Sequence, residues 1–249
     1  MAILITGHKG FIGQNMMAAL PGSVGYEWGD GSVPLDGIDR VIHLGAISST
    51  ACNDWHKLRE QNVAFSVDLL HACAARKIPF QFASSASVYG PNAKTFRETD
   101  APDPQTPYAE SKLFVENLIL TQKWPMPVQA FRYFNVHGPH EHHKDQPSPH
   151  TRFRLQAAAT GAIEVFEGSD KIHRDFVPVE QVVKVHKHFF DLTASGVYNL
   201  GTGKAKSFMD VARDIASDTG AEIVEVPMPR LKGYQRYTCA DMTKTNALF

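Results

Sequence analysis

A tyrosine and a lysine four residues apart, Tyr108 and Lys112, form the part of this sequence best suited to acid–base chemistry. On a helix, side chains at this spacing share one face and lie within reach of each other. A free tyrosine has a pKa of about 10, so a base working near pH 7 needs a shift of about 3 units, or about 4 kcal/mol. A neighbouring ammonium supplies part of that shift because it favours the phenolate. The same pattern also fits a surface position on an amphipathic helix.

A run of apolar residues that ends in hydroxyls precedes this pair. Residues 82–90 read Phe-Ala-Ser-Ser-Ala-Ser-Val-Tyr-Gly. This pattern predicts a buried strand that delivers serines to its C-terminal end, where open α/β sheets hold their active sites. Ser85 would hydrogen-bond the substrate hydroxyl that Tyr108 deprotonates, and would orient it. We therefore take Ser85, Tyr108 and Lys112 together as the candidate catalytic set.

The N-terminus predicts a phosphate-binding turn. A predicted strand, Ala2 to Thr6, is followed by Gly7, Gly10 and Gly13 and then by a predicted helix over 14–20. The glycines allow a tight turn and a close approach of the backbone to a phosphate, and the helix N-terminus offers N–H groups to a pyrophosphate. An ordinary strand–helix turn is the alternative. The placement between a strand and a helix favours dinucleotide binding.

The second strand of a dinucleotide-binding fold normally ends at the residue that meets the adenosine ribose. An acid there favours NAD, and a basic neighbour favours NADP. The predicted strand covers 23–28, so Asp30 is the candidate, although Gly29-Asp30-Gly31 is also a plain turn. The next predicted strand, 39–46, follows too soon for a helix in between, so this part of the fold is abbreviated. Gly45 at its end lets the backbone approach the cofactor, for which NAD and NADP both remain open.

The whole pattern predicts an α/β fold, a doubly wound parallel (Rossmann) sheet with a small C-terminal substrate-binding lobe. We assign 1–150 to the NAD(P)-binding domain with the catalytic set, and 151–249 mainly to the lobe, interleaved with the sheet. Further helices are predicted over 53–77, 179–192 and 208–219, and further strands over 128–134, 165–169 and 197–201.

Composition excludes several other classes of function. The chain is 43% hydrophobic and 20% charged, as expected of a soluble globular protein, and its net charge of −1 argues against nucleic-acid or polybasic membrane partners. It has no run long enough to span a bilayer, and because the N-terminus starts directly as a predicted strand we expect no signal peptide. Three scattered cysteines predict a reducing, cytoplasmic setting. The histidine-rich stretch 140–146 matches no standard zinc pattern, so we expect no metal site.

Four motifs in a fixed order carry a family resemblance across nearly the whole chain. They are Thr-Gly-x-x-Gly-Phe-Ile-Gly at 6–13, Ser-Ser-Ala-x-Val-Tyr-Gly at 84–90, the Tyr108/Lys112 pair, and Arg-Tyr-Phe-Asn-Val-x-Gly-Pro at 132–139. The chain thus resembles the extended short-chain dehydrogenase/reductases of the NAD-dependent epimerase/dehydratase family. Within that family, the stretches 43–50, 141–144, 166–177 and 231–235 are most similar to the ADP-heptose 6-epimerase subfamily.

The resemblance implies an NAD(P)-dependent enzyme that inverts a carbon of a nucleotide-diphosphate sugar, retains one cofactor per subunit and forms a homo-oligomer. It implies Tyr108 as one acid/base, with Ser85 and Lys112 as partners, and Lys144 as the second. Implied cofactor contacts are Gly7, Lys9, Gly10, Phe11, Ile12, Gly13, Asp30, Leu44, Gly45, Ala46, Asn62, Ala83, Tyr108, Lys112 and Val136. Implied substrate contacts are Ser85, Asn135, Phe166, Glu167, Gly168, Ser169, Arg174 and Tyr234.

Other interpretations stay open at the level of sequence. The chain lacks the family's usual segment after the second strand, and the loop after Lys144 reads Asp-Gln-Pro instead of small residues. Another nucleotide-sugar epimerase or reductase on the same scaffold fits the motifs. A dehydratase fits less well, because Ala86-Ser87 stands where an Asp-Glu pair would be expected. A non-catalytic NAD(P)-binding protein is the alternative from another class.

Overall fold

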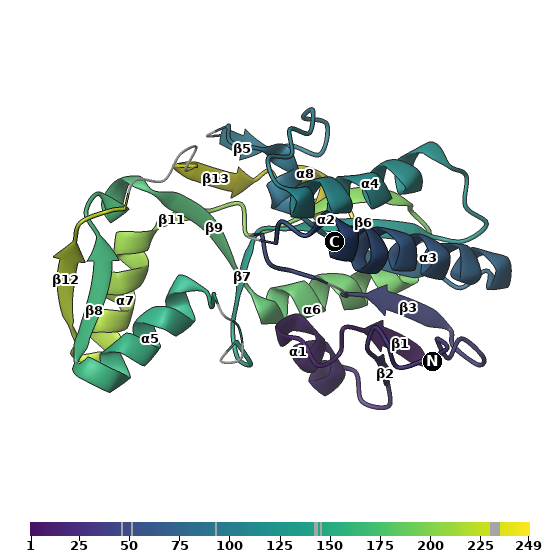
Figure 1. Ribbon diagram of the computed structural model, residues 1–249, viewed down its shortest axis with the longest axis horizontal. Coiled ribbons are helices and arrows are strands. Elements are labelled where there is room, and N and C mark those ends of the chain that lie inside the picture. The colour runs from purple at the N-terminus through teal and green to yellow at the C-terminus, as the bar shows by residue number, and fades with distance from the viewer. Residues whose placement is uncertain (46, 51, 93, 142–143, 145, 230–234) are drawn as a thin grey trace.

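A parallel six-stranded sheet forms the centre of the computed structural model, which describes residues 1–249 except 46, 51, 93, 142–143, 145 and 230–234 (Figure 1). The strand order is β10-β6-β4-β3-β1-β2, and all neighbours in it are parallel. The predicted doubly wound parallel sheet is confirmed. The bounds are β1 (Ile3–Thr6), β2 (Val24–Tyr26), β3 (Arg40–His43), β4 (Phe80–Ser85), β6 (Val128–Tyr133) and β10 (Gly196–Leu200).

Helices cover both faces of this sheet (Figure 1). On one face, α3 (Phe65–Arg76) and α4 (Pro107–Thr121) pack on apolar side chains such as Phe82 and Val128. On the other, α1 (Phe11–Ala19) and α6 (Val179–His188) pack on Ile5 and Phe131. Continuous apolar strands are expected where both faces are buried. The helix predicted over 53–77 is divided into α2 (Trp55–Leu58), a π-helical turn at Arg59–Ala64, and α3.

The abbreviated region between β2 and β3 is confirmed, since residues 27–39 contain neither helix nor strand. Leu35 and Ile38 of this connection are buried in the same apolar core as α3, which closes the end of the sheet without a helix. Because β2 and β3 lie on opposite sides of β1, the strand order reverses between β1 and β3. Ligands of open α/β sheets bind at such a reversal, beyond the carboxyl ends of the strands.

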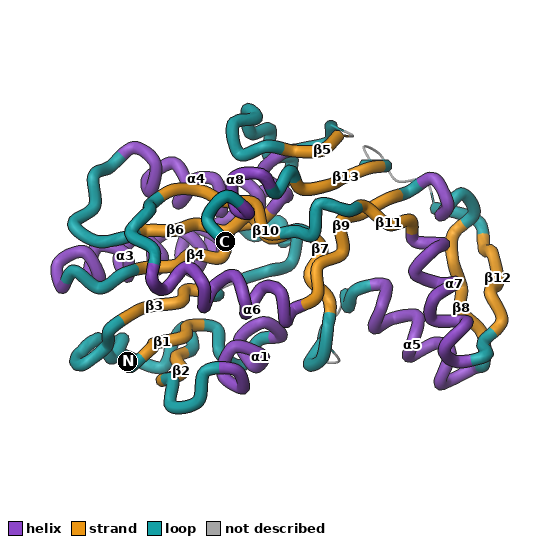
Figure 2. Tube along the Cα trace, turned by 180° about the vertical axis from the view of Figure 1, so that it is seen from behind, coloured by secondary structure: helices purple, strands orange, loops and turns teal. Residues whose placement is uncertain are grey.

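A small lobe stands at one end of the molecule, on the left in Figure 1 and on the right when the molecule is seen from behind in Figure 2. It consists of α5 (Pro149–Thr160), β8 (Ala162–Phe166), α7 (Phe208–Thr219) and β12 (Glu222–Val226), with β8 and β12 parallel. Its own core includes Phe153, Ile163 and Ile215. The central sheet takes its last strand, β10, from beyond residue 150, so the two parts interleave along the chain.

A second sheet connects the lobe to the central sheet. Its order is β11-β9-β13-β5, and β7 pairs with β9. Buried Asp175 on β9 accepts backbone hydrogen bonds from Thr202, Gly203 and Ala240, and so ties three segments together. The remaining bounds are β5 (Lys94–Phe96), β7 (Asn135–His137), β9 (His173–Pro178), β11 (Ala205–Ser207), β13 (Tyr237–Ala240) and α8 (Thr243–Asn246).

Two expected absences concern membranes and metals. Among the helices that the structure describes, none is long and apolar enough to cross a membrane. The described ranges also bring together no group of three or more His, Cys, Asp or Glu side chains able to hold a metal ion. His142 and His143 of the histidine-rich stretch lie outside the described residues.

Two neutral histidines inside the sheet core make stability pH-dependent. Burial lowers the pKa of His43 and of His186 to about 3. In the unfolded chain these histidines have a pKa of about 6.5, so below that pH they bind protons there while the buried rings of the folded chain stay neutral. This stability is therefore complete above about pH 6.5 and is lost as pH falls toward about 3, at up to about 1.4 kcal/mol per unit for each histidine.

Urea unfolding between about pH 7 and about pH 5 checks this dependence. We expect the free energy of unfolding to fall steadily as the pH is lowered. In His186→Gln the slope of this dependence should be smaller by the amount that corresponds to about one bound proton. A profile that is flat over this range would contradict the buried, neutral state of both rings.

Candidate active site

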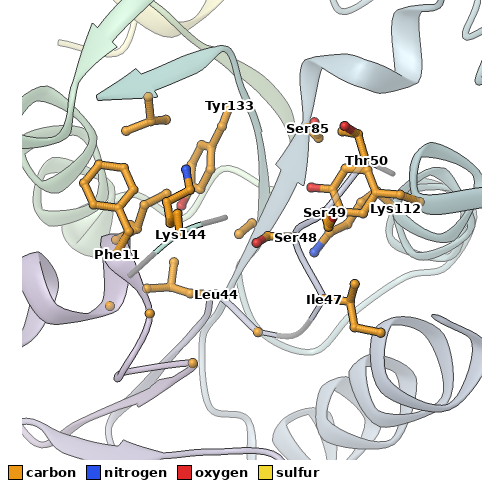
Figure 3. Close-up of a pocket in the computed structure, with 18 of the residues that line it drawn as sticks. Phe11, Leu44, Ile47, Ser48, Ser49, Thr50, Ser85, Lys112, Tyr133 and Lys144 are labelled. Atoms are coloured by element: carbon orange, nitrogen blue, oxygen red, sulfur yellow. The ribbon is translucent and has the colours of Figure 1, made fainter. Parts of the chain in front are cut away.

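A cavity of about 1010 Å³ opens at the carboxyl ends of the central strands, between the sheet and the lobe (Figure 3). It brings together most of the residues predicted from the sequence, although they come from segments more than a hundred positions apart. Those that line it are Gly7, Gly10, Phe11, Ile12, Gly13, Leu44, Gly45, Ala83, Ser85, Tyr108, Lys112, Asn135, Val136 and Lys144.

The glycine loop fits a dinucleotide phosphate. Gly7 has φ of +71°, and a Cβ there would lie 2.8 Å from the backbone nitrogen of Gly45. A Cβ on Gly13 would lie 2.1 Å from the carbonyl oxygen of Gly7, so neither position has room for a side chain. Among residues 10–15, all described, α1 has no acidic side chain in its first turn and no side-chain cap. Its N-terminal N–H groups and dipole therefore suit an anion.

The acid at the end of β2 is Glu27, not Asp30. The strand stops at Tyr26, two residues earlier than predicted, and Glu27 lines the cavity, whereas Asp30 lies outside the lining. Asp30 instead accepts the Glu27 backbone N–H at 2.8 Å and closes a turn, the alternative left open by the sequence. Lys9 also lies outside the lining of the main cavity, and its backbone N–H donates to Glu27 at 2.6 Å. Glu27 thus replaces Asp30 as the candidate ribose acid.

The three catalytic candidates meet where β4 ends beside the first turns of α4. Thr106 caps α4 by accepting the Ala109 N–H, which places Tyr108 and Lys112 on successive turns of one face. Ser85 is the last residue of β4, and its hydroxyl hydrogen-bonds the Tyr108 phenol. The Lys112 Nζ lies 5.9 Å from the centre of the Tyr108 ring. The predicted proximity of tyrosine, lysine and serine is therefore present in the structure.

Burial dominates the titration of both groups on α4. It raises the pKa of Tyr108, and the hydrogen bond to Ser85 acts in the opposite direction. Burial also lowers the pKa of Lys112 to about 8, against the attraction of Glu116. Lys112 was expected to lower the pKa of Tyr108, but in the protein alone burial raises it. For Tyr108 to act as a base, a positive charge close by must stabilise its phenolate, and the Lys112 ammonium can provide that charge.

Lys144 and Lys112 approach the cavity from opposite sides (Figure 3). Lys144 lies with Phe11 and Tyr133, its Nζ 5.1 Å from the centre of the Phe11 ring. Its neighbour Glu141 is buried and is held by the Gly138 and Ser148 backbone N–H groups. Burial lowers the pKa of Lys144, while Glu141 opposes that effect. The site therefore presents two protonatable groups to two sides of one cavity.

Asn62 braces the cavity wall from behind. Its side chain is fully buried and, outside the cavity lining, exchanges hydrogen bonds with both backbone groups of Ile47 at 2.9 and 3.0 Å. It also donates to the Ser111 hydroxyl at 3.1 Å. Asn62 is therefore a buried amide that braces the backbone of the cavity wall. Any effect of Asn62 on a cofactor passes through the 47–50 loop.

Several predicted substrate residues lie away from the cavity lining. Phe166 ends β8 in the lobe, and Glu167, Gly168 and Ser169 form the turn after it. Arg174 donates to the carbonyl oxygens of His173 and Gln235 and stacks on Phe208, so it holds the segment next to residues 230–234. Asn135 is the member of this set, besides Ser85, that lines the cavity. Ala46 and Tyr234 lie outside the described residues.

The structure adds residues that the sequence reasoning missed. Tyr133 lines the cavity, and its hydroxyl hydrogen-bonds the buried, neutral His186 at 2.6 Å. Ser148 at the start of α5 and the hydroxyls of the 48–50 loop line it as well. The position of Tyr133 near the end of a predicted strand could have indicated that it lines the site, since the strand ends at this edge of the sheet face the ligand.

Comparisons with known proteins identify a family and several similar folds. Residues 32–201 match the model of the NAD dependent epimerase/dehydratase family. ADP-L-glycero-D-manno-heptose-6-epimerase from Helicobacter pylori is 24% identical with a TM-score of 0.86, covering 99% of this chain and 89% of its own. UDP-N-acetylglucosamine 4-epimerase from Methanobrevibacter ruminantium, in complex with UDP-N-acetylmuramic acid, is 21% identical with a TM-score of 0.88, covering 99% and 91%. MoeE5 in complex with UDP-glucose and NAD is 27% identical with a TM-score of 0.80, covering 99% and 91%.

Proposed function

The chain belongs to the NAD dependent epimerase/dehydratase family, and on that premise we propose that it is a nucleotide-sugar epimerase. The observation that carries the proposal is the meeting of Ser85, Tyr108 and Lys112 with the glycine loop and Lys144 around one cavity. NAD(P) is the family's cofactor. The glycine loop and the α1 N-terminus would hold its pyrophosphate, and the ends of β1 and β3 would flank it.

The residues of this chain divide the chemistry between two sides of the sugar. NAD(P) held at the glycine loop would supply reversible hydride transfer at a carbinol carbon, so the overall reaction would involve no net oxidation. Tyr108 removes the hydroxyl proton as the ketone forms, and Ser85 orients that hydroxyl. The sugar then presents its other face to the returning hydride, and Lys144, on the opposite side of the cavity, protonates the new alkoxide. An acid/base on each side would be useful for an inversion, because each face of the transient ketone would then have its own proton donor or acceptor.

As substrate we propose ADP-D-glycero-D-manno-heptose, inverted at its C6. The support is the set of sequence stretches around 43–50, 141–144, 166–177 and 231–235 that resemble the heptose epimerases. The structural likeness to the Helicobacter pylori enzyme supports the fold alone. The position of Lys144 on the cavity wall adds chemical support, because a second acid/base opposite Tyr108 suits the inversion of a carbon centre.

The test is incubation of the protein with ADP-D-glycero-D-manno-heptose in deuterated water, with C6 followed by NMR. We expect inversion without deuterium at C6, because the hydride returns from the cofactor. Deuterium at C6 would indicate enolisation. Absence of inversion while cofactor stays bound would overturn the heptose assignment and favour another nucleotide-sugar epimerase or reductase on this scaffold. Failure with every nucleotide sugar tried would favour a non-catalytic NAD(P)-binding protein.

Glu27 is expected to make the protein prefer NAD. A carboxylate at the end of β2 accepts hydrogen bonds from the ribose hydroxyls and repels the 2′-phosphate of NADP. Glu27→Gln removes the repulsion, so we expect the preference for NAD over NADP to fall about 10-fold, or about 1.4 kcal/mol. Calorimetric titration with both cofactors measures it.

Asp30→Asn is the matched control, because it removes the same charge three residues away and outside the cavity lining. We expect its preference to equal that of the unmodified protein. A loss of preference in Asp30→Asn with none in Glu27→Gln would restore Asp30 as the ribose acid.

A further inference from the structure

A fully buried carboxylate, Glu116, stands one helical turn beyond Lys112 on α4. It is held by Arg132 of β6, whose side chain is 2% exposed. The Arg132 Nε lies 3.1 Å from each carboxylate oxygen, and a terminal guanidinium nitrogen lies 2.6 Å from Oε2. The Ser84 hydroxyl of β4 donates to the same carboxylate. This network, Glu116–Arg132–Ser84, joins α4 to the two central strands of the active-site edge.

The network reaches the cavity wall, because Ser84 lines the cavity, whereas Glu116 and Arg132 lie outside the lining. Ser84 and Arg132 are paired in the sheet, and the next pair along is Ser85 and Tyr133. Alternate residues of a strand point to opposite faces, so Ser84 and Arg132 contact Glu116 of α4, whereas Tyr133 contacts His186 of α6 on the other face. The position of Ser85 at the end of β4 and the position of Lys112 on α4 therefore depend on the same buried carboxylate.

The network also sets the charge beside Tyr108. Lys112 is buried, with its Nζ 4.9 Å from the centre of the Phe82 ring. One anion, Glu116, attracts it, and Arg132 is committed to that same anion. The other groups that face Lys112 and Tyr108 are neutral or lie across the cavity: Ser85 from β4, Tyr133 from β6, neutral His43 from β3, Gln61 and Asn62 from the π-helical turn, the 48–50 hydroxyls, and Lys144.

We propose that Glu116 and Arg132 form a positioning pair for the Tyr108–Lys112 acid/base. The guanidinium cancels the charge of the carboxylate, so the net charge of the three groups is that of one ammonium, and the pair anchors the strand end that carries Ser85. The catalytic part of this inference rests on the proposed function, whereas the charge balance at Lys112 needs no substrate.

The two single substitutions have opposite electrostatic consequences. Glu116→Gln removes an anion and keeps an acceptor for Ser84, so the pKa of Lys112 should fall below its value of about 8. Arg132→Met leaves Glu116 unpaired, so the pKa of Lys112 should rise by about 1 unit or more. The double variant restores the original net charge and should return the pKa close to its starting value. If the pair had only a structural role, the two single substitutions would not shift the pKa of Lys112 in opposite directions.

NMR of protein with 13C-labelled lysine measures the titration, with Lys112→Met identifying the Lys112 resonance. We expect a lower pKa in Glu116→Gln, a higher one in Arg132→Met, and a near-normal one in Arg132→Lys, which keeps the charge. Shifts in the same direction, or none, overturn the proposal. If Arg132→Met does not fold, Glu116→Gln decides alone, and an unchanged Lys112 titration overturns the proposal.

Sugar turnover separates this inference from the proposed function. The acidic limb of the pH profile of kcat/KM reports the ionisation of Tyr108 in the free enzyme. This acidic limb should move to lower pH in Glu116→Gln and to higher pH in Arg132→Met. Opposite shifts at Lys112 without turnover of any sugar would uphold the charge balance and refute the epimerase. Turnover with an acidic limb that neither variant moves would refute the positioning role alone.

Discussion

Replacing Tyr108 with phenylalanine should abolish epimerisation while leaving cofactor binding intact. The substitution removes a single phenolic oxygen, the group that Ser85 contacts and that takes the substrate proton. General acid–base catalysis by a positioned side chain contributes about 10²- to 10⁴-fold, so we expect turnover to fall about 10³-fold. The ring stays in place, so the affinity for NAD should change by less than about twofold. Turnover by NMR and NAD affinity by calorimetry measure the two quantities.

Tyr198→Phe is the matched control for this prediction. It also deletes one buried phenolic oxygen, but that oxygen hydrogen-bonds the Ser195 carbonyl, away from the cavity lining. We expect its turnover to equal that of the unmodified protein. If Tyr108→Phe retained full turnover, Tyr108 would not be the acid/base, and the mechanism built on it would fail.

Lys144→Met should separate the two halves of the reaction. Lys144 faces the cavity from the side opposite Lys112, so its loss should spare the first proton removal and block protonation after the sugar has turned (Figure 3). We expect net inversion to fall about 10²-fold, within the range for one acid/base, while oxidation in the first half falls much less. Methionine keeps an apolar stem of similar length and removes the ammonium that lies over the Phe11 ring.

Single-turnover absorbance of the reduced nicotinamide measures the first half, and NMR of C6 measures the whole reaction. Lys204→Met, which removes an exposed lysine remote from the cavity lining, is the control and should change neither quantity. Equal losses in both halves of Lys144→Met would remove its separate role and leave it as a binding residue.

Local patterns in the sequence determined the sheet, the glycine loop and the catalytic helix. The apolar runs predicted the strands at the sheet centre because a parallel strand buried on both faces has little choice of residue. Gly7, Gly10 and Gly13 predicted the phosphate turn because their spacing is a backbone requirement. Tyr108 and Lys112 share a face because four residues make about one helical turn.

The tertiary structure decided which of the neighbouring candidates faces the cavity. Glu27 replaces Asp30 because β2 stops two residues earlier than its apolar pattern suggests, and a side chain's direction depends on where its strand ends. Arg174 donates to the carbonyl groups of His173 and Gln235, which no spacing in the sequence reveals. Glu116 and Arg132 meet only because α4 crosses β6 at that point. Contacts between distant elements depend on how the elements pack, so they appear only once the chain has folded.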